Sequence, residues 1–222
     1  MLNTQNARIR TFTTIAAGVG WFAVVLQFYL SLRLSVANGR GIGWGMFVYF
    51  GYFTVLTNIL VALALAAPLV APNAAIARFF RRSGVITAIA ASITMVGIVY
   101  SLVLRQIWNP EGLQLVADRL LHDVMPIVFL IYWWIVVPKR GVRWADVPRW
   151  LVYPIGYLFY ALVRGAASGV YPYPFLDVDS LGYGPTLINS FIMLAGFVAI
   201  ALLLIGLNWL KPERVPVTER LP

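Results

Sequence analysis

Six stretches of mostly apolar residues follow one another along the chain, each bounded by charged residues or by glycine and proline clusters. A helix needs about 20 consecutive apolar residues to cross the hydrocarbon core of a bilayer, and each stretch is about that long. Between them, clusters such as Ala71-Pro72-Asn73 and Trp108-Asn109-Pro110 disfavour a continuing helix. We therefore predict six membrane-spanning helices, at about residues 11–34, 44–67, 84–107, 112–137, 148–168 and 186–209.

The composition favours the same class of protein. Hydrophobic residues make up 61% of the 222 residues, charged residues make up 11%, and the mean hydropathy is +0.82. Too few polar side chains remain to cover a soluble domain. The predicted fold class is all-α: a polytopic membrane protein whose residues 1–222 form one integral membrane domain, a six-helix bundle. The first stretch contains Gln27 and lacks a small-residue cleavage site before Arg33, so we expect a retained helix and not a signal peptide.

Basic residues are divided unequally between the two sides of the predicted bundle. Twelve of the seventeen basic residues fall in the tails and in the loops after the second and fourth helices: Arg8, Arg10, Arg78, Arg81, Arg82, Lys139, Arg140, Arg143, Arg149, Lys211, Arg214 and Arg220. Three acidic residues lie on the same side: Asp146, Glu213 and Glu219. The other side mixes five basic with five acidic residues: Arg33, Arg40, Arg105, Arg119, Arg164, Glu111, Asp118, Asp123, Asp177 and Asp179. Because basic loops remain in the cytoplasm, both termini are expected there. The net charge of +9 then reflects topology and contact with anionic lipid, and a nucleic-acid partner is not expected.

Several cofactors are excluded by residue type. The chain has no cysteine, which removes thiolate metal sites, iron–sulfur clusters and cysteine nucleophiles. A single histidine excludes a haem held between two histidines of this chain, and Lys139 and Lys211 lie in polar flanks, so no span carries the lysine of a retinal Schiff base. We predict no cofactor and no metal site.

The single histidine, His122, lies in the fourth predicted helix beside acidic residues. Asp118 is four residues earlier and shares its helical face, where a carboxylate can fix the imidazole tautomer, as in a general-base unit. Pro126, four residues later, has no N–H to offer the His122 carbonyl, so a bend and a free acceptor are expected. The alternative is that His122 caps the outer helix end near the lipid headgroups.

The second helix supplies a candidate nucleophile. Thr54, Thr57 and Asn58 have the i, i+3, i+4 spacing of one helical face and form a polar stripe among apolar residues. Such residues also serve as packing and hydrogen-bonding contacts between helices, which is the alternative interpretation. If this helix begins near Trp44, Thr54 lies about 15 Å inside, at a depth similar to that of His122. If the fourth helix instead begins near Asp118, the histidine lies only about 6 Å inside and the pairing needs a tilt or a kink.

Further polar residues on the outer side surround these two. Arg105 and Arg164 end the third and fifth helices; we expect them to pair with acidic residues, and the alternatives are a bound carboxylate or contact with headgroups. The loop from Tyr171 to Asp177 is stiff and aromatic, suited to an interfacial belt or to a lid over a cavity. Asn189 in the last helix faces either the bundle or a backbone carbonyl. The candidate substrate-binding residues are Arg105, Arg164, Tyr171, Asp177 and Asn189.

Three motifs together indicate a family. They are Tyr52-Phe53-Thr54, a single histidine that precedes a proline, and Val170-Tyr171-Pro172-Tyr173-Pro174-Phe175-Leu176. In this order the chain resembles the androgen-induced membrane protein family, and more closely its prokaryotic six-helix relatives, from the second to the sixth helix. Mammalian members are intramembrane threonine hydrolases that cleave esters between fatty acids and hydroxy fatty acids. The resemblance implies Thr54 as nucleophile, His122 as the catalytic histidine, membrane lipids or fatty acyl esters as partners, and a prokaryotic cytoplasmic membrane as the location.

Three hypotheses for function follow. In the first, a lipid esterase, Thr54 attacks an ester carbonyl, His122 takes the proton, Asp118 or Asp123 orients the imidazolium, and Asn58 donates to the oxyanion. Thr57 is the alternative hydroxyl on the same stripe. In the second, the same pocket binds or senses a lipid without turnover. The third, a small permease, is disfavoured because no inverted repeat is detectable and few charges lie in the inner halves of the helices.

Overall fold

The computed structural model describes residues 2–212, with side chains from residue 6 onward, and within that range the chain is all-α. The predicted cytoplasmic charges Glu213, Arg214, Glu219 and Arg220 lie outside the described residues. The helices are α1 (Leu2–Ala37), α2 (Gly41–Tyr49), α3 (Phe53–Val70), α4 (Ala75–Phe80), α5 (Ser83–Leu102), α6 (Gly112–Arg119), α7 (Met125–Val136), α8 (Val147–Trp150), α9 (Val152–Ser168), α10 (Val178–Leu181) and α11 (Tyr183–Leu210). Shorter 3-10 turns and one π-helical turn, Leu120–Val124, join some of them.

Five segments of the described chain are long and apolar enough to cross a membrane: Asn6–Ala37, Phe53–Val70, Ser83–Gln106, Gly112–Val136 and Tyr183–Leu210. The prediction of an all-α protein with several candidate membrane helices is therefore confirmed. The sixth predicted stretch, 148–168, is also helical, as α8 and the 17-residue α9, but α9 is shorter than the five long segments.

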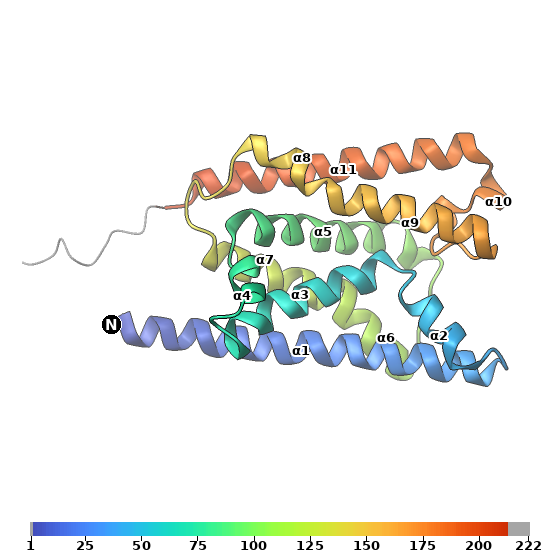
Figure 1. The fold of residues 1–222 in the computed structure, drawn as a ribbon, viewed down its shortest axis with the longest axis horizontal. Helices are drawn as coiled ribbons and strands as arrows, with labels where there is room; N and C mark the ends of the chain where they lie inside the picture. Colours follow the sequence, from blue (N-terminus) through green and yellow to red (C-terminus); the bar gives the residue numbers. More distant parts are fainter. Residues whose placement is uncertain (1, 213–222) are drawn as a thin grey trace, which may run out of the picture.

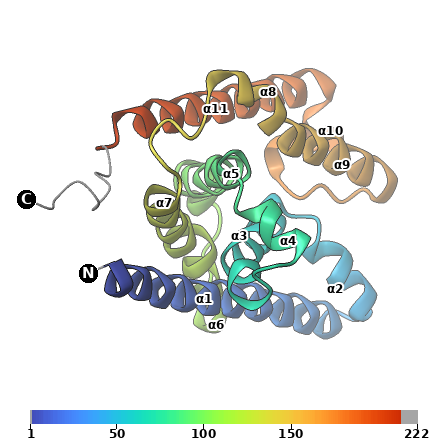
Figure 2. The same ribbon diagram turned by 60° about the vertical axis from the view of Figure 1, so that its left-hand side comes forward.

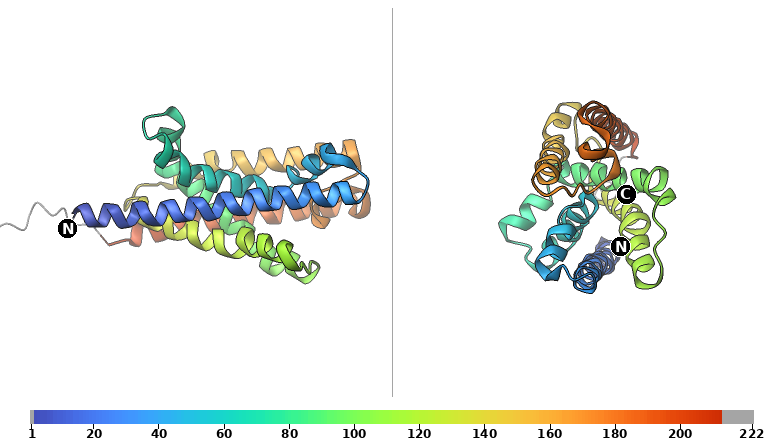
Figure 3. Two further views of the ribbon diagram at one scale, coloured as in Figure 1. Left: turned by 90° about the horizontal axis from the view of Figure 1, so that it is seen from below. Right: turned by 90° about the vertical axis from the view of Figure 1, so that its right-hand side faces the viewer.

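The helices lie roughly along one axis in three layers (Figure 1). α1 runs along one side, α9 and α11 along the opposite side, and α3, α5 and α7 lie between them, an order that the turned view repeats (Figure 2). The start of α1 and the end of α11 are at the same end of the bundle, as are α4 and the loop before α8 (Figure 1). Figure 3 shows α4 standing out from one side near that end. The other end carries α2, the start of α6, and α10 (Figure 1).

Apolar residues fill the interior and also cover the outside. Phe129, Trp133 and Phe197 are fully buried in the cluster that joins the middle layer to α11. Phe159 and Phe191 are 72% and 73% exposed. An apolar surface over an apolar core suits lipid as the surrounding solvent, because in water such a surface would drive association.

The second predicted stretch, 44–67, is not one helix, and this part of the prediction was wrong. α2 ends at Tyr49 and α3 begins at Phe53. Gly51 lies in the break, where the guanidinium of Arg164 rests against it: a Cβ atom at this position would come within 2.6 Å of the guanidinium carbon. A contact with a residue more than one hundred positions away therefore accompanies the break. Thr54 consequently lies in the first turn of α3 and not near the middle of a long helix.

The helix around His122 absorbs its proline through a π-helical turn. Leu120–Val124 adopts this wider winding, and the Met125 N–H donates to the Leu120 carbonyl. Winding of this kind releases backbone carbonyls from the regular ladder and is frequent at functional sites. The helix then continues through Pro126 into α7, whose second position tolerates a residue without an N–H. The expected disturbance at His122 is therefore a change of helical winding.

Candidate functional site

Thr54 is buried at the start of α3 beside a tyrosine from the loop between α9 and α11. Its side chain is 8% exposed. The backbone N–H of Thr54 donates to the Tyr173 hydroxyl oxygen at 3.3 Å, and the Thr54 Oγ1 lies 3.4 Å from the same oxygen. Burial raises the pKa of the Tyr173 phenol above its usual value of 10.0, so this hydroxyl is neutral at pH 7 and keeps its proton for donation.

His122 is held by a carboxylate and by a second tyrosine. Its Nδ1 lies 3.0 Å from the Asp118 carbonyl oxygen and 3.2 Å from the Asp118 Oδ1. The Tyr100 hydroxyl donates to the other carboxylate oxygen of Asp118, and the Tyr100 ring stacks on the imidazole at 3.9 Å between ring centroids. Because both neighbours of Nδ1 are acceptors, the proton of the neutral imidazole belongs on Nδ1, which leaves the Nε2 lone pair to accept another proton. The expected link between Asp118 and His122 is therefore present.

One cavity of about 690 Å³ connects the two sites. Thr54, Asp118 and His122 all line it, together with Tyr52 and Tyr173, and we call this cavity the vestibule. Its wall also includes polar residues of α1 and of the loop after it. Within the described residues, Thr54 and His122 share this cavity without a hydrogen bond between them.

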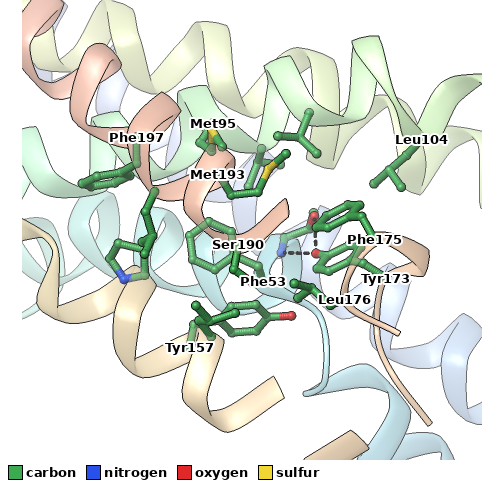
Figure 4. Close-up of a pocket in the computed structure, with 16 residues that line it drawn as sticks. Phe53, Met95, Leu104, Tyr157, Tyr173, Phe175, Leu176, Ser190, Met193 and Phe197 are labelled. Atoms are coloured by element: carbon green, nitrogen blue, oxygen red, sulfur yellow. Dashed lines mark hydrogen bonds between the residues drawn. The ribbon is translucent and has the colours of Figure 1, made fainter. Parts of the chain in front are cut away.

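A second cavity, of about 90 Å³, lies on the other side of Thr54 and is almost entirely apolar. Phe53, Met95, Tyr157, Met193 and Phe197 surround it (Figure 4), and we call it the chamber. Its walls come from α3, α5, α9 and α11. Three residues line both the chamber and the vestibule: Thr54, Leu104 and Tyr173. The candidate nucleophile therefore stands at the boundary between a polar and an apolar space.

The other two residues of the polar stripe have structural partners and line neither cavity. The Thr57 hydroxyl is 2.9 Å from that of Tyr153 on α9, and the Thr57 side chain is fully buried. The Asn58 amide nitrogen donates to the Thr54 carbonyl at 2.9 Å and to the Leu121 carbonyl at 3.2 Å. Both N–H groups of the amide are thus engaged, so Asn58 joins α3 to the π-helical turn and is not placed as an oxyanion donor.

Arg105 and Arg164 differ in the groups that they bind. Arg105 pairs with Asp123, as expected, and Asp123 also binds Arg119 at 2.8 Å, which commits this carboxylate to arginines and not to His122. For Arg164 the expected acid partner was wrong. Its guanidinium is buried, donates to the carbonyl oxygens of Val170 at 3.1 Å and Phe47 at 3.0 Å, and lies 3.9 Å over the Phe47 ring. Phe47 lies in the last turn of α2, where the helix carbonyls carry partial negative charge and stabilise a cation. Neither arginine lines the vestibule or the chamber.

The remaining candidate substrate-binding residues shape the loop over the site. Tyr171 packs on Gly165 of α9, the Asp177 carboxylate accepts the N–H groups of Asp179 and Ser180 at the start of α10, and Asn189 donates to the Phe175 carbonyl at 3.0 Å. None of Tyr171, Asp177 and Asn189 lines either cavity. The tyrosine of this loop that reaches the site is Tyr173.

Sequence reasoning missed Tyr100 and Tyr173 as site residues. Tyr173 belongs to a loop that the sequence singled out, but alternation within Tyr-Pro-Tyr-Pro does not show which ring turns inward. Tyr100 gives only a weak local signal, as a hydroxylated ring near the C-terminal end of an aliphatic helix. Its partner Asp118 is on another helix, so the contact becomes visible only where α5 packs beside the π-helical turn that follows α6.

Two further observations complete the description of the site. Among residues 2–212, no group of three or more histidine, aspartate or glutamate residues could hold a metal ion. Comparison of the chain with family models, with curated proteins and with solved structures found no match. The resemblance to the androgen-induced membrane protein family therefore stays a prediction.

Proposed function

We propose that this protein is an intramembrane lipid esterase with Thr54 as nucleophile and His122 as general base. The observation that carries the proposal is the vestibule. Buried Thr54 of α3 and His122, whose Nδ1 is engaged by Asp118 so that Nε2 can accept a proton, line this one cavity. The carboxylate that orients the imidazole is Asp118, not Asp123. The family resemblance in the three sequence motifs supports the same pair of residues.

We also propose the finer membrane arrangement. α9 serves as the sixth span: at 1.5 Å per residue its 17 residues extend about 25 Å, close to the roughly 30 Å of a hydrocarbon core, and α8 precedes it directly. We place both termini in the cytoplasm, because the start of α1, α4, the loop before α8 and the end of α11 lie at one end of the bundle (Figure 1), and these segments carry most of the basic residues of the described chain. On the family resemblance, we also propose that the membrane is a prokaryotic cytoplasmic membrane, with the vestibule on its outer side.

The reaction would proceed in two stages. In the first, the Thr54 Oγ forms a bond to the ester carbonyl carbon while its proton passes to the His122 Nε2, and the carbonyl electron pair moves onto oxygen. Collapse of this intermediate breaks the bond to the alcohol oxygen, which takes the proton from Nε2 and leaves. In the second stage, water attacks the acyl-threonine, gives its proton to Nε2, and releases the carboxylic acid as the proton returns to Thr54.

The geometry of the unliganded site sets one requirement for this scheme. The Thr54 hydroxyl has Tyr173 as its neighbour at 3.4 Å, so the proton reaches His122 after a rotation of the Thr54 side chain or through a vestibule water. Catalytic hydrogen bonds are often long before substrate binds. In place of Asn58, the candidate donor to the developing oxyanion is the Tyr173 hydroxyl, which accepts the Thr54 N–H and lies 3.4 Å from the Thr54 Oγ1.

The test compares three alanine variants of the purified full-length chain. Thr54→Ala and His122→Ala are expected to lose acyl-ester turnover by at least about a hundredfold, because each removes a group that acts on the reacting atoms. Thr57→Ala is the matched control, since it removes a buried threonine from the same helix face without touching a cavity. An alkyl fluorophosphonate should add mass at Thr54, and this labelling should fail in His122→Ala. Full turnover by folded Thr54→Ala would exclude the proposal.

A non-enzymatic lipid-binding or sensing protein is the second candidate. The observation that favours it is the pairing of Thr54 with Tyr173, which leaves the threonine and the histidine unconnected in the unliganded state. This candidate predicts stoichiometric binding of a lipid by wild type and by Thr54→Ala alike, with no release of product. Product release at more than one equivalent per protein would exclude it.

A further inference from the structure

The vestibule and the chamber meet at Thr54 but differ in size and chemistry. The vestibule holds about 690 Å³ and is lined in part by Gln27, Asn38, Arg40 and Gln114. The chamber holds about 90 Å³, and the residues around it are nearly all aliphatic, aromatic or methionine side chains. An ester whose carbonyl lies at Thr54 therefore has an apolar space on one side and a large polar space on the other.

We propose that the substrate joins an apolar acyl group to a polar alcohol, with the carbons next to the carbonyl in the chamber and the alcohol in the vestibule. This inference rests on the esterase function proposed above and adds the substrate class and its direction in the site. The reverse placement would put hydroxyl groups against Phe197 and Met193, where nothing in the chamber's lining could satisfy most of their hydrogen bonds. The difference in polarity between the chamber and the vestibule therefore sets the direction in which the ester lies.

The chamber takes the part of the acyl group next to the carbonyl. One water molecule has a share of about 30 Å³ in the liquid, and a methylene group is of similar size, so 90 Å³ admits about three such groups. The chamber is not fully enclosed, so a longer chain extends through its opening. Met95 and Met193 adjust the width of the space, since methionine adapts its shape more easily than branched residues do.

Tyr173 separates the two spaces. Its ring stacks on Phe175, with 5.1 Å between centroids and 5° between the planes, and its hydroxyl is the hydrogen-bond partner of Thr54 (Figure 4). The aromatic body of the residue thus belongs to the chamber wall and its polar tip lies beside the candidate nucleophile. A carbonyl carbon within reach of the Thr54 Oγ1 therefore places its oxygen near this hydroxyl.

The first experiment measures kcat/KM for p-nitrophenyl esters from acetate to palmitate with purified protein in detergent. Met193→Ala widens the chamber and Ser190→Val narrows it, so the two variants should shift the optimum of acyl length in opposite directions, with about a tenfold change in kcat/KM for each methylene that no longer fits or newly fits. The matched control is Leu30→Ala, a half-buried residue of the vestibule wall, which should leave the optimum in place. An optimum that ignores both chamber variants, or that moves with Leu30→Ala, would overturn the inference.

The second experiment does not depend on turnover. Thr54→Ala protein is irradiated with a short-chain carboxylic acid that carries a diazirine on its alkyl end, and the crosslinked peptides are mapped. Crosslinks on α5 and α11, at Met95 or Met193, support the chamber as the acyl site even if no ester is hydrolysed, in which case only the esterase proposal fails. Crosslinks confined to the vestibule, or none at all, overturn the inference.

Discussion

Replacing Tyr100 by phenylalanine would remove a single hydroxyl from the candidate site and keep the ring that stacks on His122. The hydroxyl donates to Asp118, whose side chain is only 2% exposed, and Tyr100 itself is 3% exposed. Water therefore has poor access to replace the lost donor. Asp118 would keep the His122 Nδ1–H as a partner but would lose the contact that holds its second oxygen in place.

The size of the effect follows from the kind of bond. A hydrogen bond to a charged group contributes about 1.5–3 kcal/mol. If the loss falls on the transition state, where the imidazolium needs a correctly placed carboxylate, kcat decreases by about 10- to 150-fold at 1.36 kcal/mol per tenfold. KM should change little, because the vestibule keeps its shape. If the loss falls on folding instead, only the thermal midpoint decreases.

The assay compares Tyr100→Phe with Tyr49→Phe. The Tyr49 hydroxyl is similarly buried and donates to the Val24 carbonyl at 2.9 Å, but Tyr49 lines neither cavity. Ester hydrolysis per folded molecule and thermal unfolding are measured for both. We expect similar losses of thermal stability and a decrease in kcat for Tyr100→Phe alone. Equal kcat values in the two variants would refute the idea that Tyr100 positions the catalytic carboxylate.

Two further predictions concern the partners of Thr54. Asn58→Ala should lower the free energy of unfolding by about 1–3 kcal/mol, because it removes the side-chain amide that donates to the Thr54 and Leu121 carbonyls. We expect kcat per folded molecule to stay within about threefold; a hundredfold loss of kcat would restore Asn58 as an oxyanion donor. Burial raises the pKa of Tyr173 in the folded state, so the contribution of this residue to stability is complete below pH 10 and decreases as pH rises above the unfolded pKa of about 10. Thermal midpoints measured between about pH 9 and 11 should therefore fall more steeply for wild type than for Tyr173→Phe. Parallel curves for the two proteins would contradict this.

The positions of the long helices could be predicted because lipid imposes a strong pattern on sequence. A spanning helix must satisfy its backbone hydrogen bonds internally and present apolar side chains over its whole length. The segments Ser83–Gln106 and Tyr183–Leu210 match the predicted 84–107 and 186–209 closely for this reason. Hydropathy cannot detect a break inside an apolar run, so the separation of α2 from α3 at Gly51 was missed. That break accompanies the packing of Arg164, a residue of α9.

The site could be predicted only where its contacts are local in the sequence. Asp118 and His122 are four residues apart on one helix, so their contact follows from helical spacing. Thr54 was identified from its polar stripe and from the motif that contains it. The hydroxyl groups of Tyr100 and Tyr173 reach the site from other elements, across 18 and 119 residues of chain, and no periodic pattern records such distances. The polar stripe also contained Thr57 and Asn58, whose structural roles depend on α9 and on the π-helical turn.

The position of α11 in the wall of the chamber has a consequence for biogenesis. Ser190, Met193 and Phe197 close this cavity, and they follow every other element of the site in the order of synthesis. A nascent chain that has not yet inserted α11 already carries Thr54 and His122, yet the chamber beside them lacks one wall. The apolar space next to Thr54 is therefore complete only when this last helix docks.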